Sequence, residues 1–291
     1  MIKTARHFFI KVAKNFKFLS SVILIPIQYE YTTGKKLNLK NPQTFNEKIQ
    51  WYKIYYKNPL FQKLADKYSV REFVKEKIGE KYLNELLGVY NNVKEIDFNK
   101  LPNKFVLKCV HGSGYNIIVK DKSKLDVSQV LKTLKKWQSR NFYSKGKEWS
   151  YKNIPRKIVA EAFLEDENAV VSDYKFFCFD GKIKFIQVDI ERKIHNLRCF
   201  YDTDWKKLHF HAEKIAFNEG EIKKPENLTD MIDVVEKLSQ NIPFVRVDLY
   251  SVKGKTIFGE MTFYPANGTK DFFPAEMNLI IGSYFNLPNK Y

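Results

Sequence analysis

The segment that most constrains this chain lies near its C-terminus and reads VRVDLYSVKGKTIFGEMTFYPANG over residues 245–268. Its first half alternates apolar and polar residues, which predicts a β-strand. A Lys-Gly turn leads into a second apolar run, so the two halves predict an antiparallel hairpin. Arg246 and Asp248 share one face of the first strand because residues two apart point the same way, and Glu260 lies on the second strand.

Charged side chains on such apolar strands require an explanation. Carboxylates on adjacent antiparallel strands can converge on a metal ion, and Mg²⁺ prefers a few carboxylates together with substrate phosphates. Asp248 and Glu260 are therefore candidate metal ligands. An ion pair between Arg246 and Asp248 on a surface sheet is the alternative interpretation.

The composition describes a globular protein that carries a strong positive charge. The 291 residues, 44% of them hydrophobic, suffice for one large domain or two ordinary ones. The 50 Lys and Arg exceed the 33 Asp and Glu by 17, so the net charge is +17. This excess indicates polyanionic partners such as nucleic acid, anionic lipid, phosphorylated cofactors or acidic glycans.

Cysteine and hydropathy patterns predict the compartment. Cys109, Cys178 and Cys199 show no CxxC spacing, which argues against a zinc ribbon or a disulfide framework and fits a reducing compartment. No apolar run reaches the ~18 residues that a spanning helix needs. The run VILIPI is interrupted by Pro26, and no small-residue cleavage site follows it. We expect a cytoplasmic protein.

Residues 1–40 differ from the rest in charge, with eight Lys or Arg against the single acid Glu30. A helical wheel over this segment predicts a basic amphipathic helix. Its apolar face would carry Ala5, Phe8, Val12, Phe16 and Leu19, with Lys3, Arg6, Lys11, Lys14 and Lys17 opposite it or at its edge. The helix could attach to a membrane surface, through contacts within residues 1–30, or dock on the protein's own core.

The remaining segments predict an α+β protein rather than a doubly wound parallel sheet. Residues 41–100 read as mostly helical, with a capping box formed by Thr44 and Glu47 and a second helical pattern that ends at Gly79. Strand patterns dominate afterwards. In YKFFCFDGKIKFIQVDI, an Asp-Gly pair between alternating runs predicts a hairpin, and PENLTDMIDVVEKLSQNI predicts a helix.

A second group of polar residues occurs in FVLKCVHGSGYN. Lys108 lies on an apolar strand, and the loop after it contains Gly112 and Gly114. Glycines let backbone N–H groups approach a phosphate, and a strand lysine supplies a fixed positive charge. The loop is neither a Walker loop nor a dinucleotide fingerprint, whose third glycine would fall at Ile117. A plain turn, with Lys108 in solvent, is the other interpretation.

Two further segments carry candidate phosphate ligands. Asp173 and Lys175 share one face of a strand in DYKFF, where Lys175 could contact phosphate or simply face solvent. The segment DIERKIHNLR concentrates Arg192, His195 and Arg198, which could clamp an anion or form a basic surface loop.

The segment VAEAFLED ends a strand with Glu161 and continues into Phe163 and Leu164. A strand that leaves its sheet through a backbone hinge can hydrogen-bond the edge of an adenine while apolar side chains cover the ring. Taken in chain order, the phosphate lysine, the glycine loop, the hinge, the second lysine and the metal hairpin resemble the ATP-grasp superfamily.

Six strings narrow this resemblance to the TupA-like ATP-grasp family, which is linked to the synthesis of teichuronopeptide and other cell-surface polysaccharides. They are TFNEKIQWYK, DKYSVREFV, LPNKFVLKCVHGSGYN, DYKFFCFDGKIKFI, RVDLY and GEMTFYPANG, and the likeness covers roughly residues 40–285. It implies an ATP-grasp fold in which two α+β lobes with mostly antiparallel sheets enclose ATP. The expected regions are the basic segment 1–40, a helical region 41–100, a small lobe 101–160 with the phosphate loop, and a large lobe 161–291 with the metal hairpin.

The resemblance also implies which residues hold the nucleotide. Lys108 would bind the α- and β-phosphates beneath a loop formed by Gly112, Ser113 and Gly114. The hinge would be Glu161 to Leu164, including Phe163, with the Leu164 N–H toward adenine. Asp173 would approach the ribose and Lys175 the phosphates.

For the metal and the chemistry, the resemblance implies Mg²⁺ on Asp248 and Glu260, with Arg246 near the γ-phosphate. Arg192 and His195 would join Arg246 in stabilising an anionic intermediate. Where the superfamily usually has Glu-x-Asn, this chain has Glu-Met-Thr, so Thr262 is a neutral and weaker metal ligand. The number of bound metal ions is therefore left open.

The implied activity is that of an ATP-dependent carboxylate–amine ligase. A uronic acid on a cell-surface polysaccharide or its precursor would be joined to an amino acid or small amine. A small-molecule kinase and a glycosyltransferase of the same pathway are the alternatives. A protein kinase would need HRD and DFG strings, which the sequence lacks. A nucleic-acid binder fits the net charge, but the sequence contains no recognised binding motif.

Overall fold

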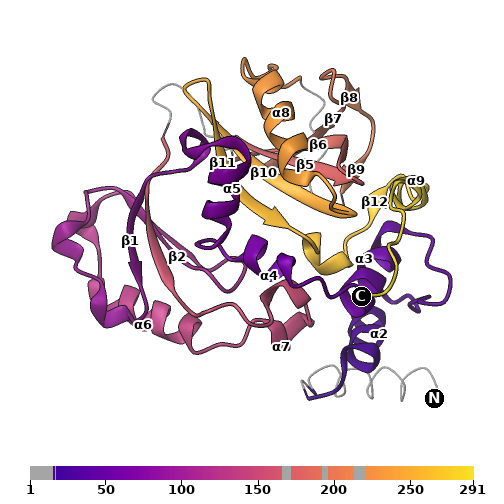
Figure 1. The fold of residues 1–291 in the computed structure, drawn as a ribbon, viewed down its shortest axis with the longest axis horizontal. Coiled ribbons are helices and arrows are strands. Elements are labelled where there is room, and N and C mark those ends of the chain that lie inside the picture. Colours follow the sequence, from indigo (N-terminus) through magenta and orange to yellow (C-terminus); the bar gives the residue numbers. More distant parts are fainter. Residues whose placement is uncertain (1–15, 17, 166–171, 192–195, 213–220) are drawn as a thin grey trace.

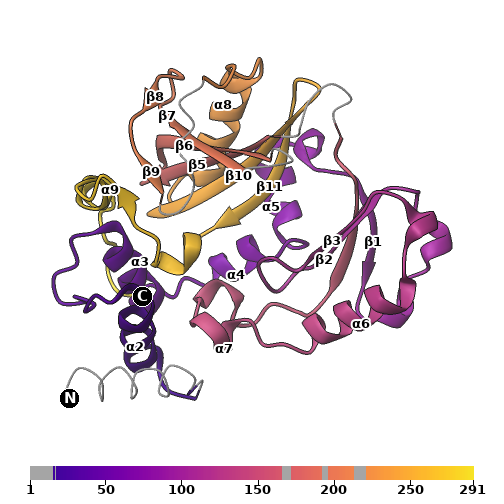
Figure 2. The ribbon, with the colours of Figure 1, turned by 180° about the vertical axis from the view of Figure 1, so that it is seen from behind.

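The computed structural model describes residue 16 and residues 18–165, 172–191, 196–212 and 221–291 (Figures 1 and 2). The α-helices are α2 (Ser21–Thr33), α3 (Phe45–Tyr55), α4 (Leu60–Ala65), α5 (Val70–Ile78), α6 (Val127–Gln138), α7 (Tyr143–Gly146), α8 (Leu228–Ser239) and α9 (Met277–Tyr284). Short 3₁₀ turns are η1 (Glu80–Tyr82), η2 (Val93–Glu95), η3 (Phe98–Lys100), η4 (Lys122–Lys124), η5 (Trp149–Tyr151) and η6 (Pro265–Gly268).

The strands are β1 (Leu86–Tyr90), β2 (Phe105–Cys109), β3 (Asn116–Val119), β4 (Ile158–Ala162), β5 (Asp173–Phe179), β6 (Lys182–Glu191), β7 (Asn196–Tyr201), β8 (Lys207–Leu208), β9 (His211–Ala212), β10 (Phe244–Val252), β11 (Lys255–Thr262) and β12 (Phe272–Phe273). Within the described residues they form a four-stranded sheet in the order β1-β4-β2-β3, a six-stranded sheet in the order β11-β10-β5-β6-β7-β8, and the pair β12-β9. Every neighbouring pair is antiparallel, as the α+β prediction requires.

The four-stranded sheet has one apolar and one mixed face. Along β2, Phe105, Leu107 and Cys109 are buried, whereas Val106 and Lys108 between them are half-buried. The buried residues pack with Val130 and Leu134 of α6 in a core of their own. Lys108 is therefore left on the face opposite α6.

The six-stranded sheet also has one apolar face and one face with charged residues. Val245, Val247 and Leu249 of β10 join the main hydrophobic core, which also contains Met231 and Val235 of α8. Figures 1 and 2 show α8 lying against one side of this sheet, with α4 and α5 between the two sheets. The apolar half of the alternation thus lies in the core that α8 shares with α4 and α5, and the charged half lies on the opposite face of the sheet.

Two local predictions are confirmed. Thr44 and Glu47 form the capping box at the start of α3, with each side chain bonded to the other residue's backbone N–H. Asp180 and Gly181 both have positive φ, at 48° and 74°, in the turn that joins β5 to β6. A type I′ turn needs this conformation at both central residues, and it matches the twist of the strands.

Two expectations for residues 41–100 were incomplete. The helical pattern before Gly79 is two helices, because α4 ends at Ala65 and α5 begins only at Val70. Asp66 ends the first helix: its carboxylate accepts hydrogen bonds from the Tyr68 backbone and the Ser69 hydroxyl. Residues 86–90 form strand β1, which pairs with β4, so sheet pairing outweighs the helical character of this region.

Most of the predicted N-terminal amphipathic helix lies outside the described residues, which begin at Phe16. Helix α2 follows and docks on the core through Leu24, Ile25 and Tyr29. In the part of the chain that the structure describes, no helix is both long enough and apolar enough to cross a bilayer. The three cysteines are buried in β2, β5 and β7, and none of them forms a disulfide bond.

Candidate active site

A cavity of about 490 Å³ is lined by both sheets and by the turn between α4 and α5. Its lining includes eleven of the residues that the sequence predicts for the site: Lys108, Ser113, Gly114, Glu161, Phe163, Leu164, Asp173, Lys175, Arg246, Asp248 and Glu260. The volume is in the range of cavities that hold small molecules and cofactors.

Lys108 and Glu161 form one wall of the cavity, on neighbouring strands of the four-stranded sheet. Glu161 of β4 lies opposite Val106 of β2, two residues from Lys108 on the same face. The Lys108 Nζ donates a hydrogen bond to Glu161 Oε2 at 2.6 Å. Arg71 of α5 lies 3.9 Å from the other carboxylate oxygen. Glu161 is buried, and these two cations stabilise its negative charge.

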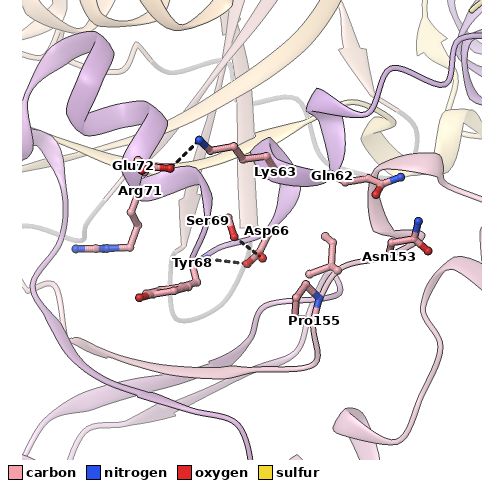
Figure 3. A pocket seen from close by; sticks show the side chains of 10 residues that line it. Gln62, Lys63, Asp66, Tyr68, Ser69, Arg71, Glu72, Asn153 and Pro155 are labelled. Carbon is pink, nitrogen blue, oxygen red and sulfur yellow. Dashed lines mark hydrogen bonds and ion pairs between the residues drawn. The ribbon is translucent and has the colours of Figure 1, made fainter.

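The turn between α4 and α5 contributes a cation that the sequence prediction left without a role. Figure 3 shows how Asp66 holds this turn through Tyr68 and Ser69. The Nζ of Lys67 donates to the carbonyl oxygen of Gly112 at 2.9 Å and lies 3.7 Å from Glu260 Oε2. Lys67 therefore links the glycine loop of one sheet to the predicted metal ligand of the other.

The hairpin of β10 and β11 forms the opposite wall, and a β-bulge determines its arrangement. Counting from the turn, Leu249 pairs with Phe258, but Asp248 pairs with Glu260, because the register shifts by one residue at Gly259. Without this bulge Glu260 would point to the other face. A Cβ on Gly259 would lie 2.9 Å from the Asp248 carbonyl oxygen, so glycine is needed at this close approach.

Arg246 holds the two carboxylates of the hairpin together. Its guanidinium donates to both oxygens of Asp248, at 2.7 and 2.6 Å, and lies 3.5 Å from Glu260 Oε1. It also donates to the Thr262 hydroxyl at 3.2 Å, and this hydroxyl donates to Glu260 at 3.1 Å. The arginine and carboxylates noted in the sequence thus form one network on the cavity face.

Charged residues continue across the sheet beyond the hairpin. Asp248 pairs in register with Lys175 of β5, and Asp173 of β5 pairs with Asp189 of β6. Lys175 donates to Asp173 and, at 2.8 Å, to Asp189. Arg198 of β7 donates to both oxygens of Asp189 at 2.6 and 3.0 Å. Positive and negative groups therefore alternate along this face.

Burial and neighbouring charges set the protonation of the two hairpin carboxylates. Burial raises the pKa of Asp248 to about 7, although Arg246 offsets part of this effect. Burial alone would also raise the pKa of Glu260, but Lys67 and Arg246 hold it below its usual value. Glu260 is therefore ionised at neutral pH, whereas Asp248 would ionise fully only with further positive charge nearby.

The geometry fits a bound nucleotide with Mg²⁺. Asp173 Oδ1 is buried and has no hydrogen-bond partner among the described residues, so it is free to accept from a ligand hydroxyl. Asp248 and Glu260 supply two adjacent carboxylates. In the described part of the chain, no group of three or more His, Cys, Asp or Glu could hold a metal ion. Two carboxylates with substrate phosphates are, however, the ligand set typical of Mg²⁺.

Four predicted site residues, Gly112, Thr262, Arg192 and His195, are not among those that line the main cavity. Gly112 contributes its carbonyl to Lys67, and Thr262 lines a neighbouring cavity. Arg192 and His195 lie outside the described residues. Arg198 lines the main cavity, where it pairs with Asp189. The roles assigned to all these residues stay predictions.

Sequence reasoning did not select several residues that line the cavity, among them Lys67, Asn84, Asp189 and Tyr250. Lys67 lies in the string DKYSVREFV, which supports the family resemblance but indicated no role for this lysine. Asn84 donates from Nδ2 to the Ala162 carbonyl at 2.8 Å, at the start of the predicted hinge. Tyr250 shares the alternation of Arg246, which could have shown that it faces the cavity.

Comparison with known proteins identifies the family. The family profile described as TupA-like ATPgrasp matches residues 47–286. No curated protein matches the sequence.

Three of the solved structures to which the chain is similar are ligases or a synthase. The D-alanine–D-alanine ligase from Bacillus anthracis, complexed with ATP, is 15% identical with a TM-score of 0.45, covering 71% of this chain and 57% of that one. The ATP-grasp ligase PsnB with its minimal precursor is 9% identical with a TM-score of 0.39, covering 72% and 55%. Carboxyaminoimidazole ribonucleotide synthase from Aspergillus clavatus, complexed with ATP, is 10% identical with a TM-score of 0.40, covering 69% and 45%.

The chain therefore spans less than two thirds of the length of each of these three structures. The family profile, in contrast, matches most of this chain, and the matched region contains both sheets and every residue that lines the cavity. The chain belongs to the TupA-like ATP-grasp family.

Proposed function

We propose that the protein is an ATP-dependent carboxylate–amine ligase. The main support is the single cavity between two sheets in which Lys108, Lys175 and Arg246 meet the carboxylates Asp248 and Glu260. A triphosphate needs several fixed cations and a metal ion, and these cations and two carboxylates that could hold Mg²⁺ line this cavity. Family membership favours ligation as the use of the ATP.

The reaction would proceed in two balanced steps. A substrate carboxylate oxygen attacks the γ-phosphorus, the bond from that phosphorus to the β-bridging oxygen breaks, and ADP leaves. The amine then attacks the carbonyl carbon of the acyl phosphate, the carbon–oxygen bond breaks, and inorganic phosphate leaves with the amine losing one proton. The product is an amide.

The protein's own residues would bind and orient the reactants. Lys108 and Lys175 would neutralise phosphate charge, and Arg246 would face the negative charge that develops during phosphoryl transfer. Lys67 would hold the glycine loop over the phosphates through Gly112. Mg²⁺ held by Asp248 and Glu260 would offset further phosphate charge.

The proposed carboxylate substrate is a uronic acid on a cell-surface polysaccharide or on its precursor, and the proposed amine is an amino acid or small amine. The support is the family link to teichuronopeptide synthesis, which the sequence strings carry, together with the net charge of +17. An excess of cations favours association with acidic glycans.

The direct test incubates the protein with ATP, Mg²⁺ and a panel of glucuronic and galacturonic acids, with and without amines. We expect ADP release and, by mass spectrometry, a product lighter by one water than the acid plus the amine. Hydroxylamine added in place of the amine should trap the acyl phosphate as a hydroxamate. A phosphorylated sugar without amide or hydroxamate would instead indicate a small-molecule kinase.

We also propose that the N-terminal segment attaches the protein to the inner face of a membrane that carries lipid-linked glycan. Phe16 and Phe18, just before α2, and Val22 and Ile23, in its first turn, are exposed apolar residues. Residues 1–40 carry eight Lys or Arg against one Glu. Exposed apolar side chains beside basic ones are typical of helices that lie on anionic membranes.

Co-sedimentation with phosphatidylglycerol vesicles tests this attachment. We expect the full chain to bind, and the double variant Phe18→Ser/Ile23→Ser to bind several-fold more weakly, because apolar burial contributes roughly 0.8 kcal/mol per CH₂. The matched control is Leu279→Ser/Ile280→Ser, which changes exposed apolar residues of α9. Equal losses in the two variants, or no binding by the wild type, would refute the attachment.

A further inference from the structure

A second cavity, of about 630 Å³, adjoins the phosphate end of the nucleotide cavity. The two cavities share Ser113 of the glycine loop together with Arg246 and Glu260 of the hairpin. The other walls come from α2, from residues 142–151 and from the turn after β11. A molecule in this cavity would therefore lie beside the group that receives the γ-phosphate.

Glu148 is the notable charged group in this second cavity. Its side chain is half-buried, and within the described residues no hydrogen bond or ion pair of 4 Å or less joins its carboxylate to another side chain. Burial raises the pKa of Glu148 to about 7, although Lys53 and Lys145 lower it in part. The half-buried carboxylate thus lines the cavity without a direct ion pair among the described residues.

Two lysines, Lys53 and Lys145, attract the Glu148 carboxylate, and within the described residues neither forms an ion pair of 4 Å or less with it. Lys53, on the buried face of α3, donates to Asn267 Oδ1 at 2.6 Å and to the Asn267 carbonyl at 3.3 Å. Arg246, on the opposite side of the cavity, is held by Asp248, Glu260 and Thr262. Lys53 and Lys145 therefore offset the charge of Glu148 only in part, and Arg246 is held by other groups.

A second polar group in the same cavity is also without a partner. Tyr264 lines the cavity and is 3% exposed, and in the described part of the chain its hydroxyl has no hydrogen-bond partner. Burial raises the pKa of Tyr264 well above its usual value, and the charge of Glu148 adds to the effect. The Tyr264 hydroxyl therefore lies close enough to Glu148 to feel its charge, and one polar group of a ligand could form hydrogen bonds with both side chains.

We propose that this second cavity binds the amine substrate, with Glu148 holding its amino group as an ammonium and Tyr264 contributing its hydroxyl. A carboxylate without a direct ion pair can accept hydrogen bonds from a positively charged ligand, and the amine is the reactant of the ligation that carries such a charge. This assignment rests on the proposed ligase function. The aromatic rings of Phe142 and Tyr151, 4.8 Å apart, would cover the body of the same substrate.

Isothermal titration tests the assignment with the protein loaded with Mg²⁺ and a non-hydrolysable ATP analogue. The probes are L-alanine, L-glutamate, L-lysine and ethanolamine, each paired with its N-acetylated form, which carries no ammonium. We expect at least one amine to bind, and to bind roughly 10- to 100-fold more weakly to Glu148→Gln, the range for losing one charge-assisted hydrogen bond. Tyr264→Phe should weaken binding less, because it removes a neutral partner.

The matched control variant is Glu226→Gln, which changes an acid on the surface whose side chain is 82% exposed. It should bind amines and nucleotide like the wild type. Glu148→Gln should keep the wild-type nucleotide affinity and melting temperature, which separates a lost ligand contact from a folding defect. Equal binding by wild type and Glu148→Gln, binding of the N-acetylated forms, or no amine binding by the wild type would overturn the proposal.

Hydroxylamine trapping separates this proposal from the ligase function itself. Hydroxylamine is largely uncharged at neutral pH and does not need an acidic site, so Glu148→Gln should still form hydroxamate. Amine binding that depends on Glu148 without any hydroxamate would retain the site and reject the ligase function. Hydroxamate formation that falls in parallel with amine binding in Glu148→Gln would reject the amine site, because Glu148 would then act on the first step.

Discussion

Replacing Lys108 with alanine is expected to reduce ATP-dependent turnover by about 10²- to 10³-fold, the usual cost of removing one group that stabilises transferring charge. Lys108 lies on the cavity face of β2, and Ser113 and Gly114 of the glycine loop line the same cavity. Its ammonium is within hydrogen-bond distance only of Glu161 among the described residues, so a phosphate could share it. The measurements are ADP release and nucleotide affinity, and both should fall.

The structure requires a matched variant, because Lys108→Ala also removes the main partner of a buried carboxylate. A buried charge left without its partner costs roughly 3–5 kcal/mol, here less because Arg71 remains 3.9 Å away. The double variant Lys108→Met/Glu161→Gln removes both charges and should restore the melting temperature. It should not restore turnover. Recovery of turnover in the double variant would show that Lys108 acts on the fold and not on the nucleotide.

A surface lysine provides the negative control for this experiment. Lys124 is 84% exposed, and its ion pair with Asp121 spans 3.5 Å at the surface. Surface pairs contribute about 0–1 kcal/mol. Lys124→Ala should therefore retain both stability and turnover, even though it removes the same charge from the protein as a whole.

Glu260→Ala is expected to abolish metal-dependent turnover, with a loss of about 10²-fold or more in kcat. Glu260 and Asp248 are the directly opposed carboxylates of the hairpin. The neighbouring cations Lys67 and Arg246 keep Glu260 ionised, so it is available as a ligand at neutral pH. A titration with Mg²⁺ or Mn²⁺ in the presence of ATP should show that the variant needs far more metal for half-maximal turnover.

The variant Glu260→Gln separates the effect of the negative charge of Glu260 from the effect of its side-chain size. Glutamine keeps the size of the side chain and can still accept the hydrogen bond that Thr262 donates to Glu260. It removes the negative charge that a metal needs, so turnover should fall nearly as far as in Glu260→Ala while the melting temperature changes less. Full turnover in Glu260→Gln at low metal concentration would contradict the assignment of Glu260 as a metal ligand.

Much of the fold follows from local sequence patterns. The capping box at Thr44 and the Asp180-Gly181 turn form as predicted, because each depends on contacts within a few residues. The alternation along β2 and β10 also correctly separates core residues from residues on the cavity face. Strand β1 was missed, since its stability comes from pairing with the distant strand β4.

Register illustrates what local patterns leave open. Counting back from the turn after Val252 places Asp248 opposite Gly259, with Glu260 on the other face, whereas the bulge brings Glu260 opposite Asp248. A similar shift between Phe177 and Cys178 brings Asp189 opposite Asp173. A glycine inside a strand is a signal for such a bulge, but its effect on register depends on the paired strand.

The sequence alone determined the chemical inventory of this protein: a lysine on an apolar strand, a glycine loop, and an arginine with two carboxylates on a hairpin. Only the tertiary structure decided that Lys67 joins the glycine loop to Glu260, and that Glu148 and Tyr264 share a cavity beside them. The physical reason is the distance along the chain between the residues that interact. Turns and alternation depend on neighbours in the chain, whereas a cavity depends on how separate sheets and helices pack against each other.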